Sequence, residues 1–193
     1  MQKVKSNLTK ELLKKTEIGI VKKPDILENR VKHSYLAIGS NLGNKINNIN
    51  LAKFELEKNR IKIVKTSSYY LSNSWPDPLL PKYINVVIKV KTTLNPLELL
   101  KYCKLIEKKL GRSRTKKNAP RTCDIDIIDY DKKVLNFIEE NLFIPHPRMK
   151  MRSFVLLPLF EIDKKWKDPK SGKNIVNLVY SLSVKNLRSI KQI

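Results

Sequence analysis

Two aspartates separated by one residue form the pattern in this chain that most strongly indicates chemistry. Asp124 and Asp126 alternate with three apolar residues, which are Cys123, Ile125 and Ile127. In a β-strand, residues two apart point to the same face and lie about 6.6 Å apart along the backbone. Carboxylates so placed repel each other unless a cation lies between them, and Mg²⁺ bridging polyphosphate oxygens would meet that need. A solvated polar sheet face is the alternative interpretation.

The loop before these carboxylates is strongly basic. Its cationic residues are Arg112, Arg114, Lys116, Lys117 and Arg121. Arginine binds phosphate through two parallel hydrogen bonds, so a basic loop beside paired carboxylates favours a triphosphate with its metal ions. A solvated basic loop remains the alternative interpretation.

One histidine stands in a restricted setting. His146 lies between Pro145 and Pro147, whose rings limit the backbone on both sides. It is a candidate site residue, although a lone histidine is more often a surface or core residue. The only other histidine, His33, has no motif around it and receives no role.

A turn with two glycines follows the first apolar stretch. Gly39 and Gly43 lie in the segment 39–44, which lacks the Gly-Lys-Ser/Thr ending of a phosphate-binding P-loop. As a turn from a strand into a helix, this segment could bring backbone close to a ligand or could simply reverse the chain.

The elements that position these residues follow from hydrophobic periodicity. Alternation and β-branched composition predict four strands, which lie at 34–38, 61–70, 83–91 and 123–127. In the third strand, Tyr83 and Asn85 point to one face and an apolar row points to the other, namely Ile84, Val86, Ile88 and Val90. A proline-rich loop, residues 73–81, separates the second strand from the third.

Capping residues mark two helices. The first follows Asn44 and keeps helical spacing through Ile46, Ile49, Ala52 and Leu56. The second is capped by Asn95, has Pro96 and Glu98 in its first turn, and ends at Gly111. Its expected buried stripe consists of Leu99, Cys103, Ile106 and Leu110.

The order strand, helix, strand, strand, helix, strand predicts an α+β fold. It is the ferredoxin-like βαββαβ pattern, an antiparallel sheet with helices packed on one face, here followed by a C-terminal extension. The other face is left for function or for this tail, which contains an apolar stretch at 154–160 and a possible last helix after Gly172. We expect a basic N-terminal extension over 1–32 and one domain over 33–185.

Composition narrows the function classes without choosing among them. The 193 residues include 40 Lys and Arg against 18 Asp and Glu, a formal charge of +22 that attracts polyanions such as nucleic acid, nucleotides and phosphorylated substrates. Scattered lysines also suit a solvated surface. Apolar runs are too short for a membrane helix or a secretory signal, and Cys103 and Cys123 suit buried thiols, so we expect a cytoplasmic protein.

Four stretches together resemble the 6-hydroxymethyl-7,8-dihydropterin pyrophosphokinase family in order and spacing. They are 35–43, 82–85, 119–126, and 144–149 followed by Arg152 and Phe154. The third, Ala-Pro-Arg-Thr-Cys-Asp-Ile-Asp, resembles the specific family signature Pro-Arg-Thr-x-Asp-x-Asp. The resemblance covers about residues 34–180 and implies the ferredoxin-like fold of that family. Asn118 and the segment 72–76 depart from commoner family residues.

The resemblance implies transfer of pyrophosphate from ATP to the pterin hydroxymethyl group, with release of AMP, in folate biosynthesis. Asp124 and Asp126 would hold two Mg²⁺ ions, and Arg112 and Arg121 would bind the phosphates and act in catalysis. Further ATP contacts would come from Glu107, Ile127, His146 and Arg152. Pterin contacts would come from Ser72, Trp75, Tyr83, Asn85 and Phe154. A monomer is the expectation from the family.

Two other function classes were weighed against this enzyme. An RNA-recognition domain shares the element order and would suit the positive charge, but it needs aromatic residues on its third strand, where only Tyr83 stands. Asp124 and Asp126 would also face nucleic acid with the wrong sign. A binding protein that has lost catalysis is disfavoured because Asp124, Asp126, Arg121 and His146 are all present.

Overall fold

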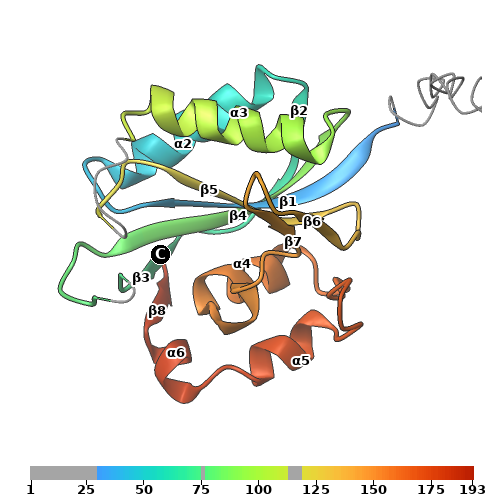
Figure 1. The fold of residues 1–193 in the computed structure, drawn as a ribbon. Coiled ribbons are helices and arrows are strands. Elements are labelled where there is room, and N and C mark those ends of the chain that lie inside the picture. Colours follow the sequence, from blue (N-terminus) through green and yellow to red (C-terminus); the bar gives the residue numbers. More distant parts are fainter. Residues whose placement is uncertain (1–29, 75–76, 113–118) are drawn as a thin grey trace, which may run out of the picture.

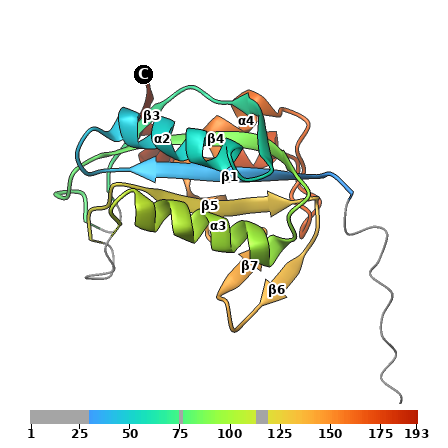
Figure 2. The same cartoon turned by 90° about the horizontal axis from the view of Figure 1, so that it is seen from above.

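The computed structural model describes residues 30–74, 77–112 and 119–193, whose centre is a six-stranded antiparallel sheet (Figure 1). β1 lies between β5 and β4, β4 also pairs with β2 and β3, and β8 pairs with β3. The strands are β1 (Lys32–Ser40), β2 (Ile61–Thr66), β3 (Tyr70–Ser72), β4 (Tyr83–Thr92), β5 (Asp124–Tyr130) and β8 (Ile190–Gln192). β6 (Leu135–Phe137) and β7 (Leu142–Ile144) form a separate hairpin beyond β5 (Figure 2). The expected α+β class with an antiparallel sheet is confirmed.

Helices cover both faces of the sheet (Figure 1). α2 (Lys45–Glu57) and α3 (Pro96–Lys109) pack on one face, against the apolar row of β4 that the alternation predicted. α4 (Ser153–Ile162) and α5 (Ile175–Tyr180) pack on the other face, against a second cluster that includes Tyr35, Val87 and Ile128. The tail therefore occupies the face that the sequence left open. Within the described residues, no helix is both long and apolar enough to cross a membrane.

Both predicted helix caps are confirmed. The Asn44 side chain accepts a hydrogen bond from the Asn47 N–H at 3.1 Å. Asn95 and Glu98 form a full capping box at α3, whose end is followed by Gly111 with a φ of +83°. One detail of the predicted stripes is wrong, because Ile46 is 40% exposed in the first turn of α2.

The strand predicted over 61–70 is in fact two strands. β2 shifts register against β4 between Ile63 and Lys65, and regular pairing resumes only in β3. In the gap, the Ser67 N–H donates to the Val87 carbonyl and the Val87 N–H donates to the Ser67 hydroxyl, both at 3.0 Å. The bulge breaks the alternation, and β3 follows the edge of β4 toward Tyr83.

The tail contains more regular structure than the sequence indicated. The apolar stretch 154–160 lies in α4, which holds Pro158 in its interior, and six of the ten residues of this helix are buried, Pro158 among them. The helix expected after Gly172 is α5, capped by Asn174, and the short helix α6 (Val184–Arg188) follows it. β8, beyond the expected domain boundary at residue 185, joins the main sheet. Strands of three residues are too short to show a period, so β6, β7 and β8 were missed.

Candidate active site

The two aspartates of the sequence motif lie at the start of β5 on one face of the sheet. The side chains of Asp124 and Asp126 are 29% and 33% exposed, whereas Cys123, Ile125 and Ile127 are buried on the opposite face. The predicted alternation is therefore confirmed. The two carboxylates face the side of the sheet that carries α4, at the end of β5 next to the basic loop.

Strand register brings candidate residues from the middle of the chain beside these carboxylates. Gly39 of β1 pairs with Asp124 on one side and with Asn85 on the other. A Cβ at Gly39 would lie 3.0 Å from Asn85 Oδ1 and 3.4 Å from Tyr83 Cδ1. Gly39 therefore lies in a strand, not in the expected turn, and its missing side chain lets the Asn85 amide and the Tyr83 ring pack closely over β1.

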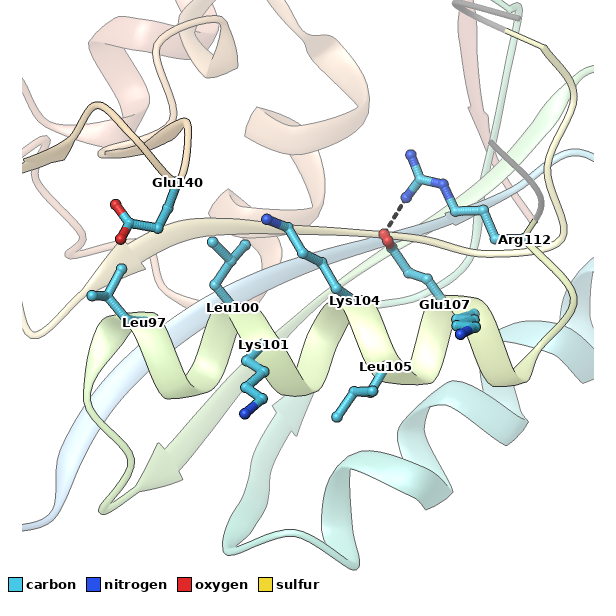
Figure 3. Close-up of a pocket in the computed structure, with 9 residues that line it drawn as sticks. Leu97, Leu100, Lys101, Lys104, Leu105, Glu107, Arg112 and Glu140 are labelled. Carbon is cyan, nitrogen blue, oxygen red and sulfur yellow. Dashed lines mark ion pairs between the residues drawn. The ribbon is translucent and has the colours of Figure 1, made fainter. Parts of the chain in front are cut away.

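Asp124 is paired with two arginines of the basic loop. Arg112 Nη1 lies 2.7 Å from Asp124 Oδ1, and Arg121 Nη1 lies 3.3 Å from Asp124 Oδ2. Arg112 also forms an ion pair with Glu107, a residue of α3 (Figure 3). Two guanidinium groups therefore converge on one carboxylate, which is an arrangement suited to binding a polyanion.

Asp126 is paired with residues from the segment after β7. Arg152 Nη1 donates to Asp126 Oδ2 at 2.9 Å, and His146 Nε2 lies 3.7 Å from the same oxygen. Burial lowers the pKa of His146, so its neutral form is favoured near pH 7. His146 Nδ1 accepts a hydrogen bond from the Arg148 N–H at 3.2 Å, which leaves the ring proton on Nε2, facing Asp126.

Glu107 connects this site to a groove along α3. Burial raises the pKa of Glu107 to about 7, although its carboxylate accepts the Ile125 N–H at 2.7 Å. The groove has a volume of about 640 Å³, and Figure 3 shows Glu107 and Arg112 at one end of it and Leu97 and Glu140 at the other. Its remaining lining residues are Leu100, Lys101, Lys104, Leu105 and Lys108. This lining combines three leucines with four cationic residues, which suits a ligand that is anionic in one part and apolar in another.

The other side of the site is polar and largely buried. Asn85 Nδ2 donates to Ser72 Oγ at 3.0 Å and to the Tyr70 carbonyl at 3.4 Å, so β3 fixes the orientation of this amide. Phe154, at the start of α4, lies beneath the Arg152 guanidinium, which is 5.4 Å from the ring centre. These side chains offer hydrogen-bonding groups and an aromatic ring to a flat heterocycle.

Asn41 links three segments of the site through one buried amide. Its Oδ1 accepts the Arg121 N–H at 2.7 Å, and its Nδ2 donates to the Pro81 carbonyl at 3.2 Å and to Ser74 Oγ at 3.4 Å. The side chain is almost inaccessible to solvent. The turn after β1, the loop before β4 and the loop before β5 are therefore held in a common arrangement.

Comparison with known proteins decides the family. The model of the family described as 7,8-dihydro-6-hydroxymethylpterin-pyrophosphokinase (HPPK) matches residues 35–164. This chain belongs to the HPPK family. The 2-amino-4-hydroxy-6-hydroxymethyldihydropteridine pyrophosphokinase of Synechocystis is 41% identical over 145 residues, which are 75% of this chain and 73% of that protein.

Longer relatives contain a region similar to this chain. The folic acid synthesis protein fol1 of Pneumocystis carinii is 42% identical over 143 residues, which are 74% of this chain but 19% of that protein. A crystal structure of Plasmodium falciparum HPPK-DHPS with pteroate has a TM-score of 0.66 at 17% identity, over 89% of this chain and 48% of that one. The chain thus spans about a fifth to a half of these longer proteins, and the structural likeness concerns the fold alone.

Most of the residues selected from the HPPK resemblance lie together in the structure. The carboxylates, arginines, His146 and the polar residues of β3 and β4 all lie toward the same end of the sheet face. Ile127 is an exception, because its side chain is 3% exposed in the core and only its backbone could meet a nucleotide. Trp75 and the loop residues Arg114, Lys116 and Lys117 lie outside the described residues.

Two positions important for the HPPK site received no role from the sequence. Gly39 and Asn41 belong to a stretch that carried the family resemblance, yet nothing local shows what they contact. A single glycine inside an apolar strand pattern suggests a close approach to the backbone, and this was the available sign for Gly39. Asn41 gave none, because its partners lie 33 to 80 residues away in the chain.

Proposed function

We propose that this chain transfers pyrophosphate from ATP to the hydroxymethyl group of 6-hydroxymethyl-7,8-dihydropterin and releases AMP. The observation that carries the proposal is the placement of Asp124 and Asp126 beside Gly39 and Asn85, with guanidinium groups directed at both carboxylates. Membership in the HPPK family and the names of the relatives support the same reaction.

The basic side of the site would bind ATP. Arg112, Arg121 and Arg152 are already directed at the carboxylates and can turn to phosphate oxygens, while the neutral His146 can donate from Nε2. The groove along α3 begins at Glu107 and Arg112 and would hold the nucleoside. Its lysines add to the positive potential that attracts the polyphosphate.

Asp124 and Asp126 fit Mg²⁺ by their chemistry. Both are partly exposed carboxylates on one strand face, and Mg²⁺ takes carboxylate, water and phosphate oxygens as ligands. Among the described residues, no group of three or more His, Cys, Asp and Glu side chains forms a metal site, so most ligands would be phosphate and water. When bound, two Mg²⁺ ions would neutralise charge on the polyphosphate.

The polar side of the site would bind the pterin. The Nδ2 group of Asn85 is bonded to Ser72, and its Oδ1, which lies over Gly39, can accept N–H groups of a heterocycle. Tyr83 and Ser72 line the same side, and Phe154 offers its ring for stacking. Trp75, in the loop after β3, is proposed as a further contact.

The reaction would proceed by displacement at the β-phosphorus. The hydroxymethyl oxygen attacks that phosphorus, the bond to the α-phosphate oxygen breaks, and AMP leaves. Reactions of this kind need correct placement of the reactants and neutralisation of charge more than covalent help from the protein. Arg112 and Arg121 supply charge at the phosphates, while Asn85 and Phe154 orient the acceptor.

A product analysis tests the proposal. The purified protein is mixed with ATP, Mg²⁺ and 6-hydroxymethyl-7,8-dihydropterin, and nucleotides are separated by chromatography. AMP that forms only in the presence of the pterin is the expected result. ADP would indicate a different phosphoryl transfer, and the absence of any product with verified reduced pterin would overturn the proposal and make RNA binding the next assay.

We extend the proposal to the organisation of the protein. The strand order β5-β1-β4-β2, with α2 and α3 on one face, supports a ferredoxin-like arrangement of the domain over 33–185 that follows the basic extension 1–32. The protein is proposed to act in the cytoplasm as a monomer. A light-scattering mass near twice 22.5 kDa would contradict the monomer.

A further inference from the structure

A segment beyond the part of the chain matched by the family model contacts both sides of the proposed site. It comprises residues 183–193, which contain α6 and β8 and are called the brace below. We infer that the brace positions the pterin-binding amide of Asn85 by holding β3 in the sheet. This inference rests on the proposed function, because it assigns the brace to the pterin half of that site.

β3 is supported by pairing on both of its edges. This strand has three residues and pairs with β4 along one edge, with Ser72 opposite Tyr83. Its other edge pairs with β8, where Ser72 lies opposite Ile190 and Tyr70 opposite Gln192. So short a strand has few hydrogen bonds of its own, and pairing on both edges fixes its position.

β3 in turn fixes the side-chain amide of Asn85. Both hydrogen bonds donated by Asn85 Nδ2 end on β3, at Ser72 Oγ and at the Tyr70 carbonyl. The opposite end of the amide, Oδ1, then lies over Gly39, 3.0 Å from the position that a Cβ would take there. A displacement of β3 would therefore rotate or release the amide group that is proposed to recognise the pterin.

The brace is fixed at both of its ends. Beyond β8, the Ile193 N–H donates to the Tyr69 carbonyl at 2.9 Å, and Gln192 Nε2 donates to Ser68 Oγ at the same distance. At the other end, Asn186 Nδ2 donates to the Met151 carbonyl at 3.3 Å, next to Arg152. The brace thus links β3 to the segment whose Arg152 contacts Asp126.

Strand geometry gives a matched pair of variants for the test. In an antiparallel pair, hydrogen-bonded and non-hydrogen-bonded residues alternate. Because the Ile193 N–H bonds to β3's neighbour Tyr69, the Lys191 N–H faces Leu71 and the Gln192 N–H faces away. Lys191→Pro removes a backbone donor to β3. Gln192→Pro keeps every bond of the ladder and loses only the side-chain bond to Ser68 Oγ, a loss that Gln192→Ala reproduces without the ring.

The experiment is steady-state AMP formation by the full chain with ATP, Mg²⁺ and the pterin. For Lys191→Pro we expect the KM for the pterin to rise about fivefold, the equivalent of one hydrogen bond, while the KM for ATP stays within about twofold. Gln192→Pro should keep both values near those of the wild type. Hydrogen exchange at residues 70–72 should become faster in Lys191→Pro alone.

The outcomes separate the brace from the proposed function. An active wild type with an unchanged pterin KM in Lys191→Pro would overturn the brace only. An equal rise in both KM values would assign β8 a purely structural role and also overturn it. A wild type that forms no AMP would overturn the proposed function and this inference with it. If Lys191→Pro does not fold, truncation after Ser189 removes β8 and must show the same selective rise.

Discussion

At the level of single residues, Asp126 is the carboxylate that contacts the segment after β7. Arg152 donates to it at 2.9 Å and His146 lies nearby, so its charge determines how the segment after β7 is placed. We predict that Asp126→Asn, which keeps the shape and removes the charge, lowers AMP formation by roughly 100-fold or more while the fold remains intact. Asp126→Ala should likewise abolish turnover.

The control for this prediction lies at the other end of the same strand. Asp131 follows β5 and has a φ of 51°, which asparagine adopts readily, so Asp131→Asn should leave both activity and melting temperature unchanged. Initial rates and circular dichroism of the two variants provide the comparison. Retained activity in Asp126→Asn would rule out its assignment as a metal ligand.

Asn41 acts through its neighbours and not through the substrates. In Asn41→Asp, the acceptor for the Arg121 N–H remains, but an oxygen replaces the donor that faces Pro81 and Ser74. We expect a loss of stability of about 1–3 kcal/mol, because a carboxylate at the buried position 41 would face the Pro81 carbonyl oxygen, which keeps only the Ser74 hydroxyl as a donor. Denaturant unfolding measures the difference.

Asn44→Asp is the matched control for that substitution. Asn44 lies three residues later and caps α2 by accepting one N–H, a role that aspartate performs equally well. Its stability should therefore remain within a few tenths of a kcal/mol of the wild type. Equal losses in both variants would show that added charge, and not the buried amide, causes the effect.

The candidate site could be predicted where the controlling pattern is local. The alternation around Asp124 and Asp126 and the faces of β4 needed only a period of two, and both are confirmed. Gly39 and Asn41 could not be understood this way, because their partners are determined by pairing between distant segments. Asn41 in particular contacts residues that no single-sequence period connects to it.

At the level of elements, an ion pair holds the segment that carries Arg152 in place. Lys150 of the turn η2 (Met149–Met151) forms an ion pair with Asp168 at 2.5 Å, and Asp168 is fully buried. Burial acts to raise the pKa of Asp168, but hydrogen bonds from Lys150 and Ser171 outweigh it and lower the pKa below 3.8. Because folding lowers this pKa, the ion pair stabilises the fold fully above the unfolded-state pKa of the aspartate. This stabilisation is lost as the pH falls through the folded-state pKa.

We therefore predict that Lys150→Met lowers the free energy of unfolding by about 1–3 kcal/mol at pH 7, because a buried carboxylate loses its cation. The difference from the wild type should shrink as the pH falls through the lowered folded-state pKa of Asp168, where the carboxylate takes up a proton. Lys170→Met is the control, since Lys170 reaches Asp168 only through its backbone N–H. A difference that stays constant with pH would contradict the role given to this ion pair.

The elements themselves were predictable in proportion to their length. The two long helices and the strands β1, β4 and β5 follow from caps and alternation, and all are present. β3 and β8 have three residues each and owe their existence to the neighbours with which they pair. The break between β2 and β3 likewise results from a register shift against β4 that no local pattern announces.

At the level of the whole molecule, the site is built from segments that span residues 39 to 154. Carboxylates from β5, cations from the loops on either side and polar residues from β3 and β4 belong to one folded unit. A ligand that binds all of them should therefore stabilise the protein against global unfolding. At a concentration of 100 times its Kd, one ligand adds about 2.7 kcal/mol.

The stabilisation by ATP should depend on Mg²⁺, since Asp124 and Asp126 would otherwise repel the polyphosphate that the arginines attract. We predict that ATP with Mg²⁺ raises the melting temperature by several degrees, and that ATP with EDTA raises it much less. Asp126→Asn should lose the Mg²⁺-dependent part, whereas Asp131→Asn should keep it. Scanning calorimetry of the three proteins makes the comparison without turnover, and equal stabilisation with and without Mg²⁺ would contradict the metal role of both carboxylates.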